Sequence, residues 1–473
     1  MAFDSLSFFL FFTAIYCLYL ILPHRAQNYL ILISNLFFYA YWDLRLLALL
    51  AVSSVLTHTC AVRIDKSPGS SERKKFLVLG VAAAIVVLVS AKLWHLTFQG
   101  SRPFPGILTE DSTAWRVIIP LGVSIFSFQM AAYCVEVYRG RLRPVKSLSD
   151  YVLFASFFPL FMAGPIEKAG TLLPQILEPR RITFEKISEG VYLVLWGFFL
   201  KLFIADNLAP IAAQLFSPAG PRDTLSTLAA LYAFAFQIYG ILAGYSNIGR
   251  GTAKLLGIDL KPNFQLPYFS SGPVEFWRRW NVSLSAWLKD YVYIPLNGSA
   301  RGGVITARNL SAAFLLGGLW YGTGWTILLW CLYHIALILG SRLVSVPSRY
   351  IASTLEGSAR EVWMAVQTVL CFHLVAVGWI FFGSSNLDEA AGIFKGFFFF
   401  NPNTFADYAG SCGRLAVLIL PLFLVEVFQK LWEDHLVLFR TPWLFQGLVY
   451  FMLLFLTVVF GAGGYQSAPF FIF

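Results

Sequence analysis

Three polar side chains that stand in apolar surroundings are the residues of this sequence best suited to chemistry. Tyr321 lies in the segment GGLWYGTGW (317–325), His334 ends the segment CLYH, and Asn281 follows the segment FWRRW. Imidazole is the usual general base because its pKa lies near neutrality. A phenol, whose unperturbed pKa is about 10, is a poor base at neutral pH, but it can donate a hydrogen bond to an acceptor oxygen. We therefore expect the phenol of Tyr321 to polarise a substrate. The amide of Asn281 can hold a substrate, but it cannot relay a proton.

The role of His334 depends on the path of the backbone. In one continuous helix, the 13 residues from Tyr321 to His334 would place the two side chains about 20 Å apart on roughly opposite faces. A break at Gly322 and Gly324 would shorten this gap only if the chain folded back. We therefore expect His334 to be a structural or cavity-lining residue, with a catalytic or substrate-binding role as the alternative.

The segment 257–309 is the longest polar break in the sequence, and it contains an amphipathic pattern. Its large apolar residues recur at steps of three and four, which predicts one helix with an aromatic face and a polar face that bears Arg278, Ser285 and Lys289. Such a helix lies along the membrane interface, or it turns Asn281, at the edge of the aromatic stripe, towards a polar cavity. Arg278 and Arg279 either clamp a phosphate or carboxylate group of a ligand or anchor the helix at the interface. The stripe consists of Trp277, Trp280, Leu284, Trp287, Leu288 and Tyr291.

The composition places these residues in a membrane protein. Of the 473 residues, 58% are hydrophobic and 13% are charged, and the mean hydropathy is +0.68. This apolar surface exceeds what a soluble globule of this length can bury. Four segments without Asp, Glu, Lys or Arg approach or exceed the roughly 20 residues that cross a bilayer. They are 6–23, 224–248, 362–386 and 441–473.

Less uniform apolar runs raise the prediction to about eleven to thirteen hydrophobic segments, some of them re-entrant or interrupted by Pro and Gly. The first segment lacks a basic n-region and a cleavage site, so we expect it to be retained. No internal repeat is visible, and we predict one polytopic all-α domain over 1–473. The less uniform runs are 28–62, 76–98, 117–135, 149–163, 190–204, 304–320, 323–343 and 414–428.

The charged residues and the cysteines exclude other classes. The net charge is +10, and its basic clusters are typical of positive-inside loops that face anionic lipid headgroups rather than nucleic acid. The six cysteines are scattered without a C-x-x-C pair, which indicates neither a disulfide framework nor a zinc or other metal site. The basic clusters are Arg139, Arg141, Arg143 and Lys146, then Arg180 and Arg181, then Arg278 and Arg279.

Several long segments, in order, resemble the membrane-bound O-acyltransferase (MBOAT) family. The resemblance is to the branch that contains the membrane subunit of alginate O-acetylation and the D-alanyl transfer protein of teichoic acids. So many long matches in the right order are specific, unlike a single short motif. They are LISNLFFYAYWD (32–43), PLGVSIFSFQMAAYCVEVYRG (120–140), FPLFMAGPIEKAGTLLPQI (158–176), KLFIADNLAPI (201–211), the segment 244–298, and LLGGLWYGTGWTILLWCLYH (315–334).

The resemblance implies a helical, barrel-like core with a central tunnel, and the motif-bearing part of this chain lies at roughly 115–345. It implies transfer of an acyl group, acetyl in this branch, from a cytoplasmic thioester to a hydroxyl acceptor of an envelope polysaccharide, a carrier or a small molecule. The donor would be acetyl-CoA or an acyl carrier protein, used as a cosubstrate, with no bound cofactor. Membrane lipid and a periplasmic acetyltransferase or the carrier protein are the expected partners, in the bacterial cytoplasmic (inner) membrane.

The sequence departs from the family pattern at the positions that matter most. The family's catalytic histidine follows GGLW, and a second histidine, or Asn in some eukaryotic members, follows FWRRW. Here these positions are Tyr321 and Asn281. Ile241 and Asn247 replace two further ionisable residues. Four neutral replacements favour an alternative, in which the chain is a catalytically degenerate scaffold or binding module, or carries out a changed reaction in the same tunnel.

The resemblance and the spacing give a list of further site residues. Glu167 follows AGPI, which the family uses near the tunnel, although a carboxylate after a Gly-Pro break can equally cap a helix. Isolated histidines in apolar runs, namely His58, His95 and His373, are expected to be satisfied buried or interfacial groups, and His24 and His435 to lie in loops. We predict His334, Tyr321 and Asn281 as catalytic residues, and Arg278, Arg279, Asn247, Glu167 and Trp320 as substrate-binding residues.

Overall fold

The computed structural model describes residues 1–97, 115–217, 223–296, 303–322, 324–399, 405–434 and 436–462. Every regular element in these ranges is a helix, which confirms the predicted all-α class. The side chain of His95 and the whole of His435 lie outside the described part.

Seven helices in the described part are long and apolar enough to cross a membrane. They include the runs predicted around 224–248, 362–386 and 441–460, whereas the first apolar run forms a helix of only 16 residues, Leu6–Ile21. The run 149–163 is interrupted as expected: its helix ends at Ser156 and a short 3₁₀ turn containing Pro159 follows. The seven are Leu44–Lys66, Phe184–Leu215, Thr224–Leu255, Trp325–Leu343, Gly357–Gly383, Gly410–Leu431 and Trp443–Phe460.

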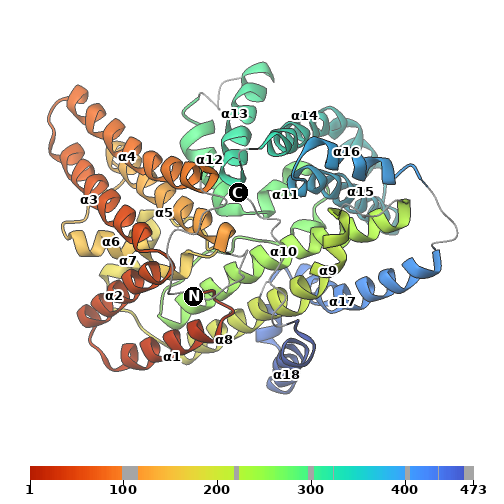
Figure 1. The fold of residues 1–473 in the computed structure, drawn as a ribbon, viewed down its shortest axis with the longest axis horizontal. Coiled ribbons are helices and arrows are strands. Elements are labelled where there is room, and N and C mark those ends of the chain that lie inside the picture. The colour runs from red at the N-terminus through yellow and green to blue at the C-terminus, as the bar shows by residue number, and fades with distance from the viewer. Residues whose placement is uncertain are drawn as a thin grey trace. The chain divides into compact units, whose positions relative to one another are not determined.

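The chain divides into two compact units. Unit 1 contains Met1–Phe198 and Tyr245–Pro262, and α3, α4 and α5 pack against one another within it (Figure 1). The expectation of a single domain stays a prediction. The helices of unit 1 are α1 (Leu6–Ile21), α2 (His24–Trp42), α3 (Leu44–Lys66), α4 (Ser70–Thr97), α5 (Trp115–Tyr138), α6 (Leu148–Ser156), η1 (Phe158–Leu160), α7 (Ala169–Leu177) and α8 (Phe184–Phe198).

Unit 2 contains Phe199–Gly244 and Asn263–Phe473, and the helix α10 (Thr224–Leu255) contributes residues to both units. Within unit 2, α14 packs against both α13 and α15. The remaining helices of unit 2 are η2 (Phe199–Ala205), α9 (Asp206–Leu215), η3 (Pro267–Phe269), α11 (Pro273–Arg279), α12 (Val282–Leu288), η4 (Lys289–Tyr293), α13 (Gly303–Tyr321), α14 (Trp325–Thr354), α15 (Gly357–Gly383), α16 (Leu387–Gly396), α17 (Phe405–Leu431), η6 (Val437–Arg440) and α18 (Trp443–Phe460).

The core of unit 2 is strongly aromatic. Trp280, Trp330 and Trp379 are among the largest fully buried side chains, and their rings contact one another with centroids 5.0 Å (Trp280–Trp379) and 6.2 Å (Trp330–Trp379) apart. Aromatic pairs at such distances are favourable beyond the area they bury. This cluster joins α11, α14 and α15 and forms the support beneath the candidate site.

Candidate functional site

A cavity of about 440 Å³ lies in unit 2, between α11, α12, η4, α13 and α14. Most of its wall is apolar, and Leu284, Leu288 and Leu310 are typical of it. Two of the three predicted catalytic residues, Asn281 and Tyr321, line it. A ligand pocket of this kind is mostly apolar with a few convergent polar groups, so the cavity has the character expected of a binding site for an apolar group.

The predicted continuous helix over 277–291 is wrong, because the chain breaks at Trp280 and Asn281. Asn281 has φ 44° and ψ 57°, in the left-handed region, and separates the seven-residue helices α11 and α12. Asn and His are among the few residue types enriched in that region. The break replaces the expected single aromatic face, and it buries Trp280, which is 1% exposed.

The break leaves the amide of Asn281 available to the cavity. Helix N-termini need acceptors for their first N–H groups, and here Asn263 supplies them. Its carbonyl oxygen accepts from Val282 N at 2.9 Å, and its Oδ1 accepts from Ser283 N at 3.1 Å and Ser283 Oγ at 2.9 Å. Asn281 makes no side-chain cap bond to α12, so its amide can point elsewhere.

Asn281 and Tyr321 form a hydrogen-bonded pair on the cavity wall. The Nδ2 of Asn281 donates to the Oη of Tyr321 at 2.8 Å, and the indole N–H of Trp280 donates to the same oxygen. Tyr321 is the last residue of α13 and is 3% exposed. Because its oxygen already accepts from two donors, the chemistry left to this phenol is donation of its own O–H. The pair is arranged to polarise a carbonyl rather than to remove a proton.

The chain folds back between Tyr321 and His334, so the separation calculated for a continuous helix does not apply. α13 ends at Tyr321, and α14 begins at Trp325 and packs against it. The two helices approach closely at Gly318, where a side chain would not fit: a Cβ added there would lie 2.0 Å from the Cys331 sulfur. The Trp330 ring then contacts both predicted residues, with centroids 5.5 Å from Tyr321 and 5.3 Å from His334.

His334 lies behind the cavity wall, since it is not among the described residues that line the cavity. Its Nδ1 accepts from the indole Nε1 of Trp277 at 3.3 Å, and Trp277 lines the cavity. This bond fixes the proton of the neutral ring on Nε2. Nε2 is buried without a hydrogen-bond partner among the described residues and faces α15, where a Cβ at Gly378 would approach it to 2.6 Å. In this arrangement His334 holds an indole in place, and it reaches the cavity only if Trp277 moves.

Three basic side chains line the cavity, and two of them were not among the predicted site residues. Arg278 lines it as predicted, together with Lys289 and Arg342. Lys289 lies on the predicted polar face, whereas Arg342 follows a long apolar run and has no spacing signal in the sequence. Among the described residues that line the cavity, none is His, Asp, Glu or Cys. The wall therefore favours an anionic or carbonyl group and offers no ordinary general base.

Two other predicted residues of unit 2 have different surroundings. Arg279 forms an ion pair with Glu275, one helical turn away, with 2.6 Å between Nη2 and Oε1. Trp320 is 4% exposed and is not among the described residues that line the cavity. Arg279 thus stabilises α11, and Trp320 is a buried residue of α13.

Glu167 belongs to unit 1 and does not cap α7, whose N-cap Lys168 makes no side-chain cap bond. Its Oε1 accepts from Lys261 N at 3.0 Å and its Oε2 accepts from Thr171 Oγ1 at 3.0 Å. Burial raises the pKa of the Glu167 carboxyl, and these hydrogen bonds oppose the rise. Asn247, also in unit 1, accepts from Arg250 at 2.9 Å. Both predicted residues have structural partners here, and their role in substrate binding stays a prediction.

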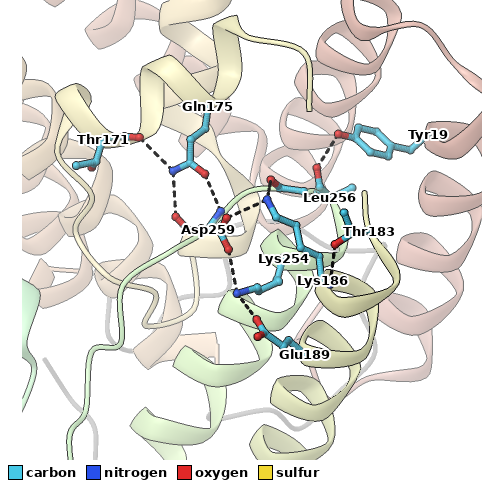
Figure 2. Close-up of polar contacts among 10 residues, drawn as sticks. Tyr19, Thr171, Gln175, Thr183, Lys186, Glu189, Lys254, Leu256 and Asp259 are labelled. Carbon is cyan, nitrogen blue, oxygen red and sulfur yellow. Dashed lines mark hydrogen bonds and ion pairs between the residues drawn. The ribbon is translucent and has the colours of Figure 1, made fainter. Parts of the chain in front are cut away.

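A polar network around Asp259 holds the connection after α10 in place (Figure 2). Asp259 pairs with Lys186 at 2.9 Å and Lys254 at 3.0 Å, and Lys254 also pairs with Glu189. The Gln175 side chain donates to the Asp259 carbonyl and accepts from its N–H. Charges that are mutually neutralised in this way indicate a structural role.

The isolated histidines with described side chains are satisfied groups, as expected for His58 and His373. His24 was expected in a loop, but it is the first residue of α2, and it also has a backbone partner. The contacts are His24 Nε2 to Ile176 O at 3.0 Å, His58 Nε2 to Val145 O at 2.9 Å, and His373 Nε2 to Tyr232 Oη at 2.7 Å.

Comparisons with known proteins agree with the resemblance seen in the sequence. A family model described as MBOAT, membrane-bound O-acyltransferase family, matches residues 33–372. The probable alginate O-acetylase AlgI of Azotobacter vinelandii is 33% identical over 437 residues, which cover 90% of this chain and 85% of the relative. The peptidoglycan O-acetyltransferase of Helicobacter pylori is 30% identical over 80% of this chain and 76% of the relative. The teichoic acid D-alanyltransferase of Streptococcus thermophilus is 29% identical over 45% of this chain and 54% of the relative.

Proposed function

Because this chain belongs to the membrane-bound O-acyltransferase family, we propose that it passes an acetyl group from a cytoplasmic thioester to a hydroxyl of an envelope polysaccharide, a carrier or a small molecule. The names of the alginate and peptidoglycan relatives support acetyl as the group transferred. The donor is acetyl-CoA or an acyl carrier protein, and a periplasmic acetyltransferase is the partner on the acceptor side. The protein works in the bacterial inner membrane, in contact with membrane lipid.

The hydrogen-bonded pair of Asn281 and Tyr321 on the wall of an apolar cavity is the observation that supports this proposal most. An acyl thioester needs an apolar site that excludes water, with few polar groups in it. A phenol O–H aimed at the thioester carbonyl stabilises the charge that develops on that oxygen during acyl transfer. Arg278 and Lys289, on the same wall, suit a phosphate of the donor.

The transfer balances without a net proton acceptor. The acceptor oxygen forms a bond to the thioester carbonyl carbon, and the carbon–sulfur bond breaks. The proton lost by the hydroxyl is matched by the proton that the leaving thiolate takes up. A base at the acceptor would still accelerate the step by about 10²–10⁴-fold, and among the residues we assign to the reaction His334 alone is an imidazole. Its use requires Trp277 to swing away from Nδ1.

A second function follows from the absence of His, Asp, Glu and Cys among the described residues that line the cavity. The chain would then be a catalytically degenerate relative that keeps the cavity as a binding module or scaffold, or that carries out a changed reaction. In that case the donor thioester would bind, with the cationic side chains contributing, but its acyl group would not leave the carrier at a catalysed rate.

The test is acyl transfer in vesicles that contain the purified protein, with radiolabelled acetyl-CoA or acetylated carrier protein as donor. We expect transfer by the wild type and a rise of up to about 10²-fold in Tyr321→His, because imidazole restores a base at the cavity wall while the phenol donor is lost. Empty vesicles measure transfer without the protein. An Asn281→Leu variant, which removes the hydrogen bond to the Tyr321 oxygen, tests whether transfer depends on this pair. No transfer by the wild type and no gain in Tyr321→His on either donor would exclude the acyltransferase and leave the scaffold.

A further inference from the structure

A buried carboxyl in unit 2 has no part in the proposed reaction. Glu426 lies on α17, inside the candidate membrane span Gly410–Leu431, and is 3% exposed. Its Oε1 is 2.5 Å from the Oη of Tyr239, which is itself buried on α10. The phenol of Tyr239 is the donor and the carboxyl oxygen of Glu426 is the acceptor in this hydrogen bond.

A carboxyl at this depth is costly for a membrane helix and is retained mainly where it has a function. An apolar side chain of similar volume would hold α17 against α10 more cheaply than a buried acid does. Packing alone therefore does not account for Glu426, and its contact with Tyr239 is the place to look for a role.

Tyr239 contacts both Glu426 and Trp280, the residue that precedes Asn281 at the cavity. Its centroid is 6.2 Å from that of Trp280 and 5.6 Å from that of Tyr268, and Tyr268 is 6.1 Å from Trp280. The Tyr268 hydroxyl is tied to the backbone, donating to Ala235 O at 2.7 Å. Trp280 therefore rests on two tyrosines whose hydroxyls are each held by a hydrogen bond.

Trp280 in turn sets the geometry of the proposed site. It directly precedes Asn281, at the break between α11 and α12, and its indole donates to the Tyr321 oxygen that also accepts from Asn281. A shift of the indole would move both donors of that oxygen together. Interiors packed this closely transmit small displacements.

We propose that Glu426 is a positioning residue: by holding the Tyr239 hydroxyl, it fixes Trp280 and so the orientation of Asn281 and Tyr321 at the cavity. Nothing in this role requires Glu426 to contact substrate. Either an ionised or a neutral carboxyl can accept a hydrogen bond from the phenol O–H. The role therefore needs an acceptor oxygen at this position and not a negative charge. The expected effect on turnover rests on the proposed function, whereas the expected effect on the positions of Trp280, Asn281 and Tyr321 does not.

The experiment compares Glu426→Leu, Glu426→Gln, Tyr239→Phe and the double variant Glu426→Leu/Tyr239→Phe. Glu426→Leu strands a buried phenol O–H, which will seek another acceptor and disturb the ring. We expect kcat to fall about 10-fold to 100-fold with little change in the KM for donor, as for a small misplacement of reacting groups. Glu426→Gln keeps an acceptor and should stay within a few-fold of the wild type. The double variant should lose no more than either single variant, because the two residues act as a unit.

A second readout is independent of turnover. A cysteine introduced by Ala286→Cys, at a position that lines the cavity, is labelled with a maleimide, and its labelling rate is followed by peptide mass spectrometry. We expect Glu426→Leu to change this rate and Glu426→Gln to restore it. A rate unchanged in Glu426→Leu, or a Gln variant that behaves like Leu while remaining folded, would overturn the proposal. If the wild type transfers no acyl group while the labelling pattern is as expected, the proposed function fails and the positioning role stands.

Discussion

Polar groups are used in opposite ways in the two units. In unit 1, Asp259, Lys186, Lys254 and Glu189 form a chain of ion pairs, and Gln175 satisfies the backbone of the same connection (Figure 2). In unit 2, the described part of the cavity wall carries three cations and no carboxylate. The first set has its partners within the protein, and the second has a surplus of one sign.

This difference separates framework from binding site more reliably than residue type does. Glu167, in a segment that resembles the family's tunnel region, bonds to Lys261 N and Thr171 of its own unit. Asn281 and Tyr321 are neutral, yet they are the side chains presented to the cavity. Ion pairs within the protein stabilise the framework of unit 1, whereas a few polar side chains on the wall of an apolar space suit a ligand.

The largest expected effect is on the cavity side of this comparison. Tyr321→Phe should lower kcat about 10²-fold, because it removes the donor to the acyl carbonyl. The ring contacts with Trp330 and Phe382 are retained, but the N–H groups of Asn281 and Trp280 lose their acceptor, so the free energy of unfolding should fall by about 1–3 kcal/mol while the protein stays folded. The measurement is acyl transfer in vesicles beside a thermal melt in detergent. Full activity in a folded Tyr321→Phe would mean that this phenol does not act on the substrate.

The second effect tests whether His334 belongs to the framework. Gly378→Ala places a Cβ 2.6 Å from the His334 Nε2, so the ring must shift at a cost of about 1–3 kcal/mol, with loss of the Trp277 bond. Gly340→Ala is the matched control, since it lies in α14 with nothing within 4 Å of its added Cβ. The control should be neutral or stabilising. Equal unfolding temperatures for the two variants would contradict this packing.

A third test concerns the backbone of unit 1. Ala163 has φ 92°, which non-glycine residues rarely adopt, so Ala163→Gly should raise the free energy of unfolding by about 1 kcal/mol. The same exchange within a helix, Ala61→Gly in α3, should lower it by about the same amount. Both are read from thermal unfolding in detergent. A destabilising Ala163→Gly would show that the methyl packs better than the strain suggests.

The smallest expected effect lies in the network of Figure 2. Burial alone would raise the pKa of Asp259, but its hydrogen bonds and ion pairs with Lys186 and Lys254 hold that pKa below its ordinary value. A lowered pKa contributes stability above the unfolded value and loses it as the pH falls through the folded value. Asp259→Asn should therefore be less stable than the wild type at pH 7, by less than about 1 kcal/mol for such an exposed pair. The difference should shrink as the pH falls below the ordinary pKa of an aspartate and through the lowered pKa of Asp259. A constant difference over this range would contradict the ion pairing.

The sequence predicted the helical class and most spans because long apolar runs leave few alternatives in a bilayer. It also predicted that Asn281 and Tyr321 would border a cavity, and the cavity is there. The single helix over 277–291 was wrong, because periodicity does not reveal a left-handed residue at Asn281 or an acceptor supplied by Asn263.

Other features depend on contacts between distant segments. The fold-back between α13 and α14 requires Gly318 to meet Cys331, and spacing alone left it open. Lys289 was visible on the polar face, but Arg342 and Glu426 carry no local signal. Their positions depend on how α14 and α17 pack against segments distant in the sequence. Glu426, for example, contacts Tyr239, which lies more than a hundred residues before it.

The left-handed backbone at Asn281 limits the choice of residues there to a short list that includes histidine. An imidazole at this position would therefore need no remodelling of the main chain. The genetic code makes the exchange simple as well, since the codons for asparagine, tyrosine and histidine differ only in their first base. A single base change at position 281 or at position 321 would thus introduce the histidine of the family pattern. Neither change requires a different fold.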